Sequence, residues 1–72
     1  MLARYAFEFS EHLDSKTATT LVNNMQNIGT VVNTGPGRTY EVQVFRASRV
    51  ERARISLANY EISGFLTWRR LD

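Results

Sequence analysis

The sequence contains no cysteine, so neither a disulfide nor a thiolate-bound zinc ion can stabilise the fold. Its uninterrupted apolar runs are two or three residues long, far below the roughly 20 residues of a membrane-spanning helix. The N-terminal stretch MLARYAFEF has no charged-then-apolar signal pattern, because Arg4 and Glu8 interrupt it. We therefore expect a soluble, cytoplasmic protein that makes no membrane contact and is stabilised by packing.

Groups that perform catalysis or bind metals are also scarce. The only histidine, His12, has Glu11 and Asp14 as its nearby acidic neighbours, and the sequence has neither an HExxH motif nor a paired-histidine spacing. The carboxylates are scattered singly, and no serine lies in a GxSxG motif. The sequence therefore predicts no catalytic residue, no metal site and no cofactor. We expect a protein that is not an enzyme, with His12 in a solvated loop.

What is present describes a small globular domain. The chain has 72 residues, of which 43% are hydrophobic and 22% charged, a composition typical of folded proteins. Residues 1–72 should therefore form one small domain, for which the element order described below predicts the α+β class. A chain of this size buries only about 60% of the surface that its unfolded form exposes. Such chains often gain stability by pairing with a copy or with a partner.

Four stretches alternate between apolar and polar residues or are rich in β-branched ones, which predicts strands. These stretches cover residues 3–9, 30–33, 39–45 and 65–71. Between the second and third, Thr34-Gly35-Pro36-Gly37-Arg38 predicts a turn, because proline fixes one φ angle and either glycine can take a positive one. This turn leads into a strand and not into a helix, so we interpret it as a hairpin turn and not as a phosphate-binding loop.

The first predicted helix follows a capping residue at Asp14 or Ser15. Behind this cap, apolar residues recur three and four apart, which is helical spacing: Ala18, Leu21, Val22, Met25 and Ile28. Gly29 stands just past the last turn, a position that glycine favours because it tolerates the left-handed conformation there. We expect the helix to end at this residue.

The second helix is predicted over residues 49–62, although Ile55 and Leu57 also alternate as in a strand, which leaves a strand as the alternative. Ser48 and Glu51 match a capping box. Apolar residues three and four apart behind this cap would form an inward seam: Val50, Ala53, Leu57 and Tyr60.

The element order is strand, helix, strand, strand, helix, strand. This order predicts the ferredoxin-like βαββαβ arrangement, an α+β fold with a four-stranded antiparallel sheet and two helices on one face. Because the same arrangement hosts many unrelated functions, it does not indicate a function by itself.

Eight of the nine basic residues are arginine, and four of them lie in the stretch FRASRVERARIS: Arg46, Arg49, Arg52 and Arg54. On a helix, Arg49 and Arg52 lie side by side about one turn apart, whereas Arg54 points elsewhere. Glu51 and Glu61 reduce the local positive charge. We interpret these arginines mainly as the solvated side of a helix, and arginine-favouring codon usage explains the excess over lysine equally well.

A nucleic-acid-binding module is the second hypothesis, because ferredoxin-like sheets also form RNA-recognition motifs, which stack bases on aromatic side chains of the open sheet face. Here the outward positions of the central strand are Glu41, Gln43 and Phe45, which supply one aromatic ring and one repulsive charge. This hypothesis relies on basic residues of the second helix and the last strand: Arg46, Arg49, Arg52, Arg69 and Arg70.

The apolar residues exceed what one small core can hide. Ile55 and Ile62 lie off the inward seam, Phe45 lies on the outer sheet face, and Phe65 or Trp68 is also left over. Exposed apolar surface usually marks a protein contact, and tryptophan and arginine often dominate its energy. The predicted partner-binding residues are Phe45, Arg46, Arg49, Arg52, Ile55, Ile62, Trp68, Arg69 and Arg70.

These features favour a small, non-enzymatic protein-interaction module that binds the surface of a larger protein partner, as an adaptor or inhibitor does. Small catalytically bare domains of this kind are common among the accessory proteins of phages and mobile elements. A symmetric homodimer is compatible with this hypothesis and with the nucleic-acid hypothesis.

Overall fold

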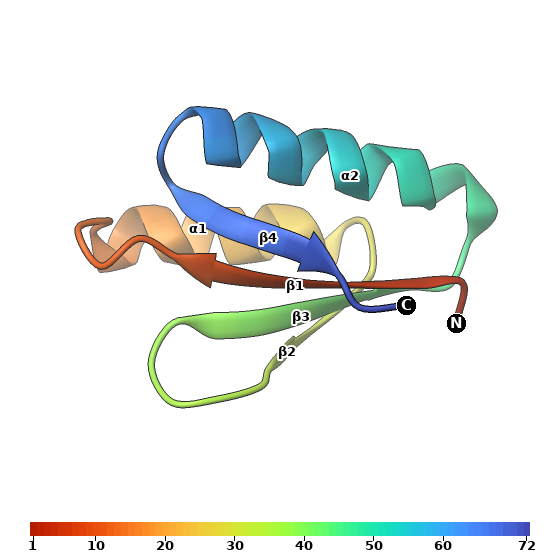
Figure 1. Cartoon of the computed structure of the whole chain (residues 1–72), viewed down its shortest axis with the longest axis horizontal. Helices are drawn as coiled ribbons and strands as arrows, with labels where there is room; N and C mark the ends of the chain where they lie inside the picture. The colour runs from red at the N-terminus through yellow and green to blue at the C-terminus, as the bar shows by residue number, and fades with distance from the viewer.

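A computed structural model describes all 72 residues of the chain (Figure 1). The elements are β1 (Ala3–Phe9), α1 (Ser15–Gln26), β2 (Thr30–Asn33), β3 (Thr39–Val44), α2 (Ala47–Ile62) and β4 (Leu66–Arg70). Their order is the predicted one, and residues 49–62 are helical, so the strand alternative for this segment is wrong.

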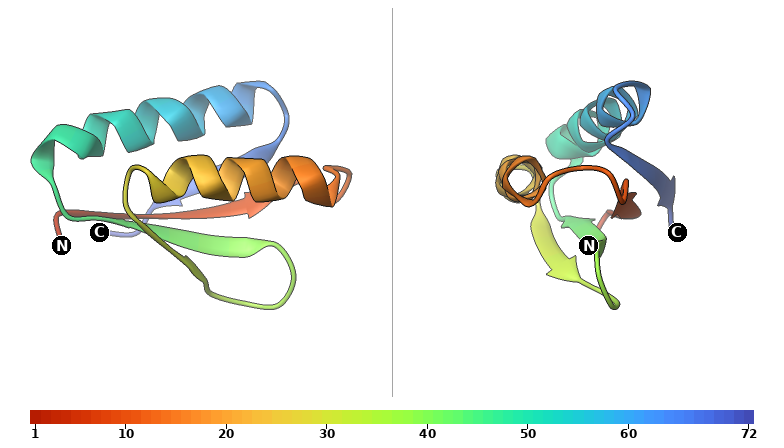
Figure 2. Two further views of the ribbon diagram at one scale, coloured as in Figure 1. Left: turned by 180° about the vertical axis from the view of Figure 1, so that it is seen from behind. Right: turned by 90° about the vertical axis from the view of Figure 1, so that its left-hand side faces the viewer.

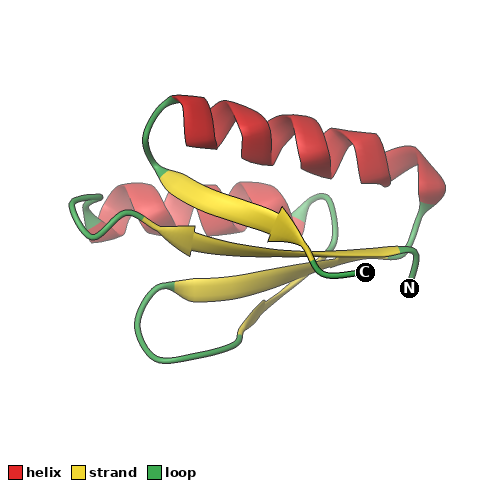
Figure 3. Ribbon diagram, in the orientation of Figure 1, coloured by secondary structure: helices red, strands yellow, loops and turns green.

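The four strands form one sheet in the order β2-β3-β1-β4, and every neighbouring pair is antiparallel. Both helices cover the same face of this sheet, as Figures 2 and 3 show. The predicted ferredoxin-like arrangement is therefore confirmed. The opposite face of the sheet carries no other element and is called the open face below.

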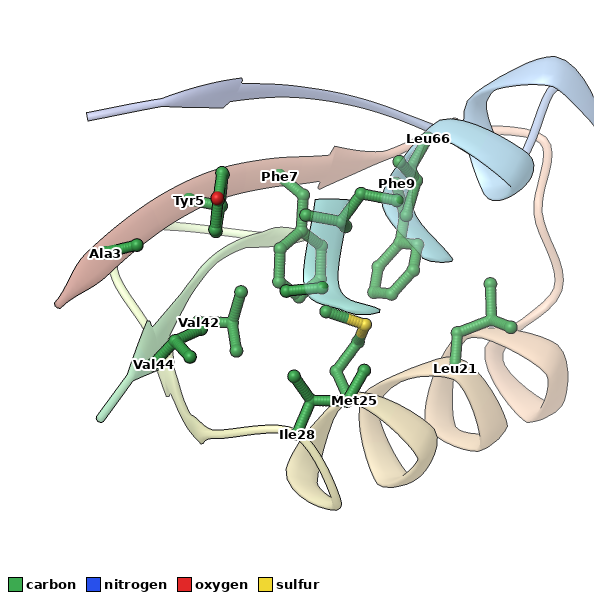
Figure 4. Close-up of a cluster of buried hydrophobic side chains, with 12 residues drawn as sticks. Ala3, Tyr5, Phe7, Phe9, Leu21, Met25, Ile28, Val42, Val44 and Leu66 are labelled. Atoms are coloured by element: carbon green, nitrogen blue, oxygen red, sulfur yellow. The ribbon is translucent and has the colours of Figure 1, made fainter. Parts of the chain in front are cut away.

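The core lies between the sheet and the two helices (Figure 4). In β1, alternate residues such as Tyr5 and Phe7 point towards the helices and are fully buried, as the period-two pattern predicts. The β1–β3 register places them opposite Val42 and Tyr40, which share this face. The buried apolar residues are Ala3, Tyr5, Phe7, Phe9, Leu21, Met25, Ile28, Val42, Val44, Ala53, Leu57 and Leu66. Neither helix is long and apolar enough to cross a membrane.

The two helices begin differently. The Asp14 carboxylate caps α1 as predicted, because its Oδ2 accepts the Thr17 backbone N–H at 3.2 Å. In α2, by contrast, the capping position is Arg46, whose side chain makes no capping hydrogen bond. The predicted capping box is therefore wrong. Ser48 already lies inside the first turn of α2, and Glu51 forms an ion pair with Arg54 instead.

α1 ends at Gln26 and not at Gly29 as predicted, and Gly29 is needed for a different reason from the predicted one. Its φ angle is not positive; the only glycines with positive φ are Gly37, in the predicted hairpin turn, and Gly64, before β4. A Cβ atom at Gly29 would instead lie 2.3 Å from the backbone oxygen of Gln43. Glycine is required here because the chain after α1 passes very close to β3.

Candidate interaction surfaces

The exposed apolar side chains are the first group of candidates. Ile62, Phe45 and Ile55 expose 83%, 55% and 51% of their surface, which confirms that they have no place in the core. Trp68 differs, because it is half-buried and packs edge-on against Tyr5, with ring centroids 5.8 Å apart. The prediction that either Phe65 or Trp68 would be left out of the core is wrong, since both pack partly buried against it.

Ile55 and Ile62 form a pair on the outermost line of α2, which we call the α2 stripe. Ile55 lies two residues from both Ala53 and Leu57, which is about 200° around the helix axis from these fully buried residues. Ile62 lies two turns further along the same line. The exposed Arg52 flanks the stripe. The inward seam of the helix thus fixes the orientation of the stripe towards solvent.

Phe45 does not belong to this stripe. It follows β3 directly, before α2 begins at Ala47, whereas Ile62 is the last residue of the helix. The length of α2, about 24 Å at 1.5 Å per residue, therefore separates Phe45 from Ile62. Phe45 instead lies near the exposed Leu2, whose N–H donates to the carbonyl of Val44 at 2.8 Å. The nine predicted partner-binding residues consequently do not form one continuous surface.

Two of the predicted arginines make contacts within the chain. The Arg49 guanidinium donates to the carbonyl oxygen of Asn27, the capping residue at the C-terminus of α1, at 3.0 Å. A cation at this end of a helix is favourable, so Arg49 connects the two helices. The Arg70 guanidinium lies 5.6 Å from the centre of the Tyr5 ring, and its Nε donates to Asp72 at 3.3 Å.

Three predicted arginines, Arg46, Arg52 and Arg69, are exposed and form no ion pair. Arg46 and Arg52 belong to the start and the first half of α2. Arg69 pairs in register with Ala6 and therefore lies on the open face, on the other side of the sheet from α2. The unpaired cations thus lie on two sides of the molecule.

The open face carries a polar network that sequence reasoning did not identify. Glu41 in the central strand β3 is only 8% exposed, and its carboxylate lies 3.7 Å from the Arg4 guanidinium and accepts a 2.9 Å hydrogen bond from Gln43. The strand residues that share this face include Ala6 and Arg69 but no aromatic residue. The face therefore lacks the rings on which RNA-recognition motifs stack bases.

Two glutamates, Glu8 and Glu61, line one hollow of about 410 Å³ at the start of β4. Its lining residues are Glu8, Phe9, Ser10, Glu61, Gly64, Leu66 and Thr67. Glu8 and Glu61 are exposed and have no ion-pair partner in the chain. We call this feature the acidic hollow. No sequence signal could have found it, because its two carboxylates are far apart along the chain.

The remaining titratable groups do not converge. His12 is exposed and lies 3.7 Å from Glu11, and no three side chains of metal-binding type are grouped. A hydrogen bond from the Arg4 backbone N–H lowers the pKa of Asp72, and Arg70 adds to this effect. Hydrogen bonds from Thr17 lower the pKa of Asp14 in the same way.

Comparison of the chain with protein-family models, with curated proteins and with solved structures finds no match.

Proposed function

We propose that this protein is a protein-interaction module that binds the surface of a larger protein through the α2 stripe, as an adaptor or inhibitor does. The observation that carries the proposal is the exposure of Ile55 and Ile62 on a helix whose inward seam already packs against the core. An i, i+7 pair of anchors is the spacing with which a helix inserts into an apolar groove. A fully exposed isoleucine gains about 1.5–3 kcal/mol on burial, so Ile62, at 83% exposed, would contribute most of this and Ile55, at 51%, about half.

The charges beside the stripe indicate the chemistry of the partner. On one flank, Glu51 and Arg54 neutralise each other in an ion pair. On the other flank, Arg52 is exposed without a partner and is available for a two-pronged contact with a carboxylate. The proposed partner therefore has an apolar groove with an acidic residue on the rim that faces Arg52.

Affinity capture from native host extract tests this proposal. The wild-type protein and the variant Ile55→Asp/Ile62→Asp are compared, each with and without nuclease treatment. Phe45→Asp is the matched control, because Phe45 is about as exposed as Ile55 but precedes α2 and lies outside the stripe. We expect partner proteins whose capture survives nuclease treatment. Their capture should be lost with the isoleucine variant and retained with Phe45→Asp. The captured protein, once purified, should bind the wild type and Phe45→Asp equally well.

Two results would contradict the proposal. Capture that depends on Phe45 and not on the isoleucines would place the binding surface at the end of the sheet. Capture that is lost after nuclease treatment, together with binding that weakens steeply as salt is added, would favour the nucleic-acid hypothesis. The salt dependence arises because contacts to phosphates release counterions. Loss of that binding in Arg46→Ala/Arg52→Ala would then identify the cations responsible.

A further inference from the structure

The outer edge of β4 has unpaired main-chain groups. β4 is an edge strand of the sheet, and no other element lies beside its outer edge (Figure 2). The Ser10 N–H donates to the Phe65 carbonyl at 2.8 Å, and the Leu71 N–H donates to the Arg4 carbonyl at 2.9 Å. In an antiparallel ladder, residues whose main-chain groups point towards the neighbouring strand alternate with residues whose groups point away from it. Phe65 and Leu71 bond on the β1 side, so the main-chain direction of the residues between them follows from this alternation. Those whose N–H and C=O groups point away from β1 are Leu66, Trp68 and Arg70.

The two ends of β4 carry opposite charge. The acidic hollow, with Glu8 and Glu61, lies at the start of the strand beside Leu66 and Thr67. Arg69 and Arg70 form its other end, and both are exposed; Arg70 is paired with Asp72, so Arg69 is the cation without an ion-pair partner there. An antiparallel copy of the same strand would place the basic end of each chain against the acidic end of the other.

We propose that β4 pairs with β4 of a second copy of this chain, antiparallel and about a two-fold axis at Trp68. In this register Trp68 lies opposite the partner's Trp68, and their outward main-chain groups form a hydrogen-bonded pair. Leu66 lies opposite the partner's Arg70, and Thr67 lies opposite the partner's Arg69. The two sheets then form one continuous sheet across a closed, symmetric interface.

This register is favoured over its neighbours for two reasons. It pairs every residue of β4, whereas a shift in either direction shortens the ladder. A two-fold axis at Arg69 would also place two arginines directly opposite each other, and like charges in that position are destabilising. Arginines on a sheet edge normally discourage association. Here they disfavour the register centred on Arg69, and the register centred on Thr67 is disfavoured only by its shorter ladder.

The side chains of the two copies complement each other in this register. The partner's Arg69 lies beyond Thr67 on the open face, two strand spacings or about 10 Å from Glu8 on β1. A fully extended arginine and glutamate can together bridge this separation. On the helix face, the partner's Arg70 lies beside Leu66, next to Glu61 in the acidic hollow.

Charge exchange tests the pairing in the full chain. Sedimentation over a concentration series is expected to show a dimer for the wild type. Arg69→Glu and Glu8→Arg should each weaken dimerisation at least about tenfold, because the two-fold axis repeats each change. The combined variant Glu8→Arg/Arg69→Glu should restore it. A wild type that stays monomeric at high concentration, or an Arg69→Glu chain that dimerises as well as the wild type, would overturn the proposal.

Introduced cysteines test the register, since the chain has none of its own. Thr67→Cys and Arg69→Cys are on the exposed open face, so neither change disturbs the core. Oxidation should cross-link the two variants to each other in a mixture, while each variant alone should stay largely uncross-linked. Cross-linking of Arg69→Cys alone would refute the axis at Trp68. The pairing does not depend on the α2 stripe, so Ile55→Asp/Ile62→Asp should still dimerise even though its partner capture fails.

Discussion

Truncation of Phe7 to alanine should destabilise this protein severely. Phe7 is 1% exposed in the central strand β1 and lies between the sheet and the helices. Its ring stacks on Tyr40, with an interplanar angle of 16° and centroids 5.6 Å apart, and meets Phe9 edge-on at the same centroid distance. The substitution removes both aromatic contacts and leaves a cavity, because the surrounding strands cannot collapse to fill it.

The expected loss is large relative to the total stability. A buried Phe→Ala change costs about 3–5 kcal/mol. At about 0.05–0.15 kcal/mol per residue, a chain of this length has a free energy of unfolding of about 4–11 kcal/mol. Since 1 kcal/mol shifts the midpoint of a small domain by about 4–8 °C, the melting temperature of Phe7→Ala should fall by at least about 12 °C, or the variant should not fold at all.

Thermal and urea unfolding, followed by circular dichroism, measures this effect. Phe45→Ala is the matched control, because it removes the same atoms from a side chain that is 55% exposed. It should lose only about 0.5 kcal/mol, as is usual at the surface. If Phe7→Ala melts within a few degrees of the wild type, or if Phe45→Ala is the more damaging change, the assignment of the inward face of β1 is wrong.

Three further substitutions test particular contacts. Gly29→Ala should cost about 1–3 kcal/mol in urea unfolding, because its Cβ would overlap the Gln43 backbone oxygen; unchanged stability would mean that the chain after α1 does not pass so close to β3. Tyr5→Phe should leave the melting temperature unchanged or raise it, since the buried hydroxyl has no hydrogen-bond partner; a clear loss would reveal a partner. Asp14 has a lowered pKa in the folded chain, so its ionised form stabilises the fold above the unfolded pKa of 3.8, and this contribution is lost as the pH falls through the folded value. As the pH is lowered through the folded pKa of Asp14, the melting temperature should therefore fall more for the wild type than for Asp14→Asn. If the melting temperatures of the two proteins fall in parallel, the bond to Thr17 does not depend on charge.

The alternation of β1 and the spacing of the apolar residues in both helices were sufficient to predict the fold from sequence. Each pattern is local, and burying one face of every element leaves few arrangements for a chain of 72 residues. The same patterns also identified Ile55 and Ile62 as surplus to the core, because a residue on the outward line of a helix cannot also face the core.

Helix termini were predicted less well, because they depend on neighbours that are distant in the chain. The sequence around Ser48 and Glu51 matches a capping box, but α2 begins at Ala47, shortly after β3 ends at Val44. α1 ends at Gln26, three residues before Gly29, and Gly29 itself is required for a reason that the sequence did not show. That reason, a close approach to the Gln43 backbone oxygen, exists only once β3 lies against this segment.

The candidate surfaces were decided mainly by tertiary structure. The sequence determined that the chain has many arginines and more apolar side chains than its core can hold. It could not determine that Arg49 reaches the end of α1, nor that Arg69 lies on the opposite side of the sheet from Arg52. The acidic hollow is a further case, because Glu8 and Glu61 come together only when β4 pairs with β1. Periodicity along the chain fixes which way a side chain faces, whereas the neighbours of that side chain depend on how strands and helices from distant segments pack together.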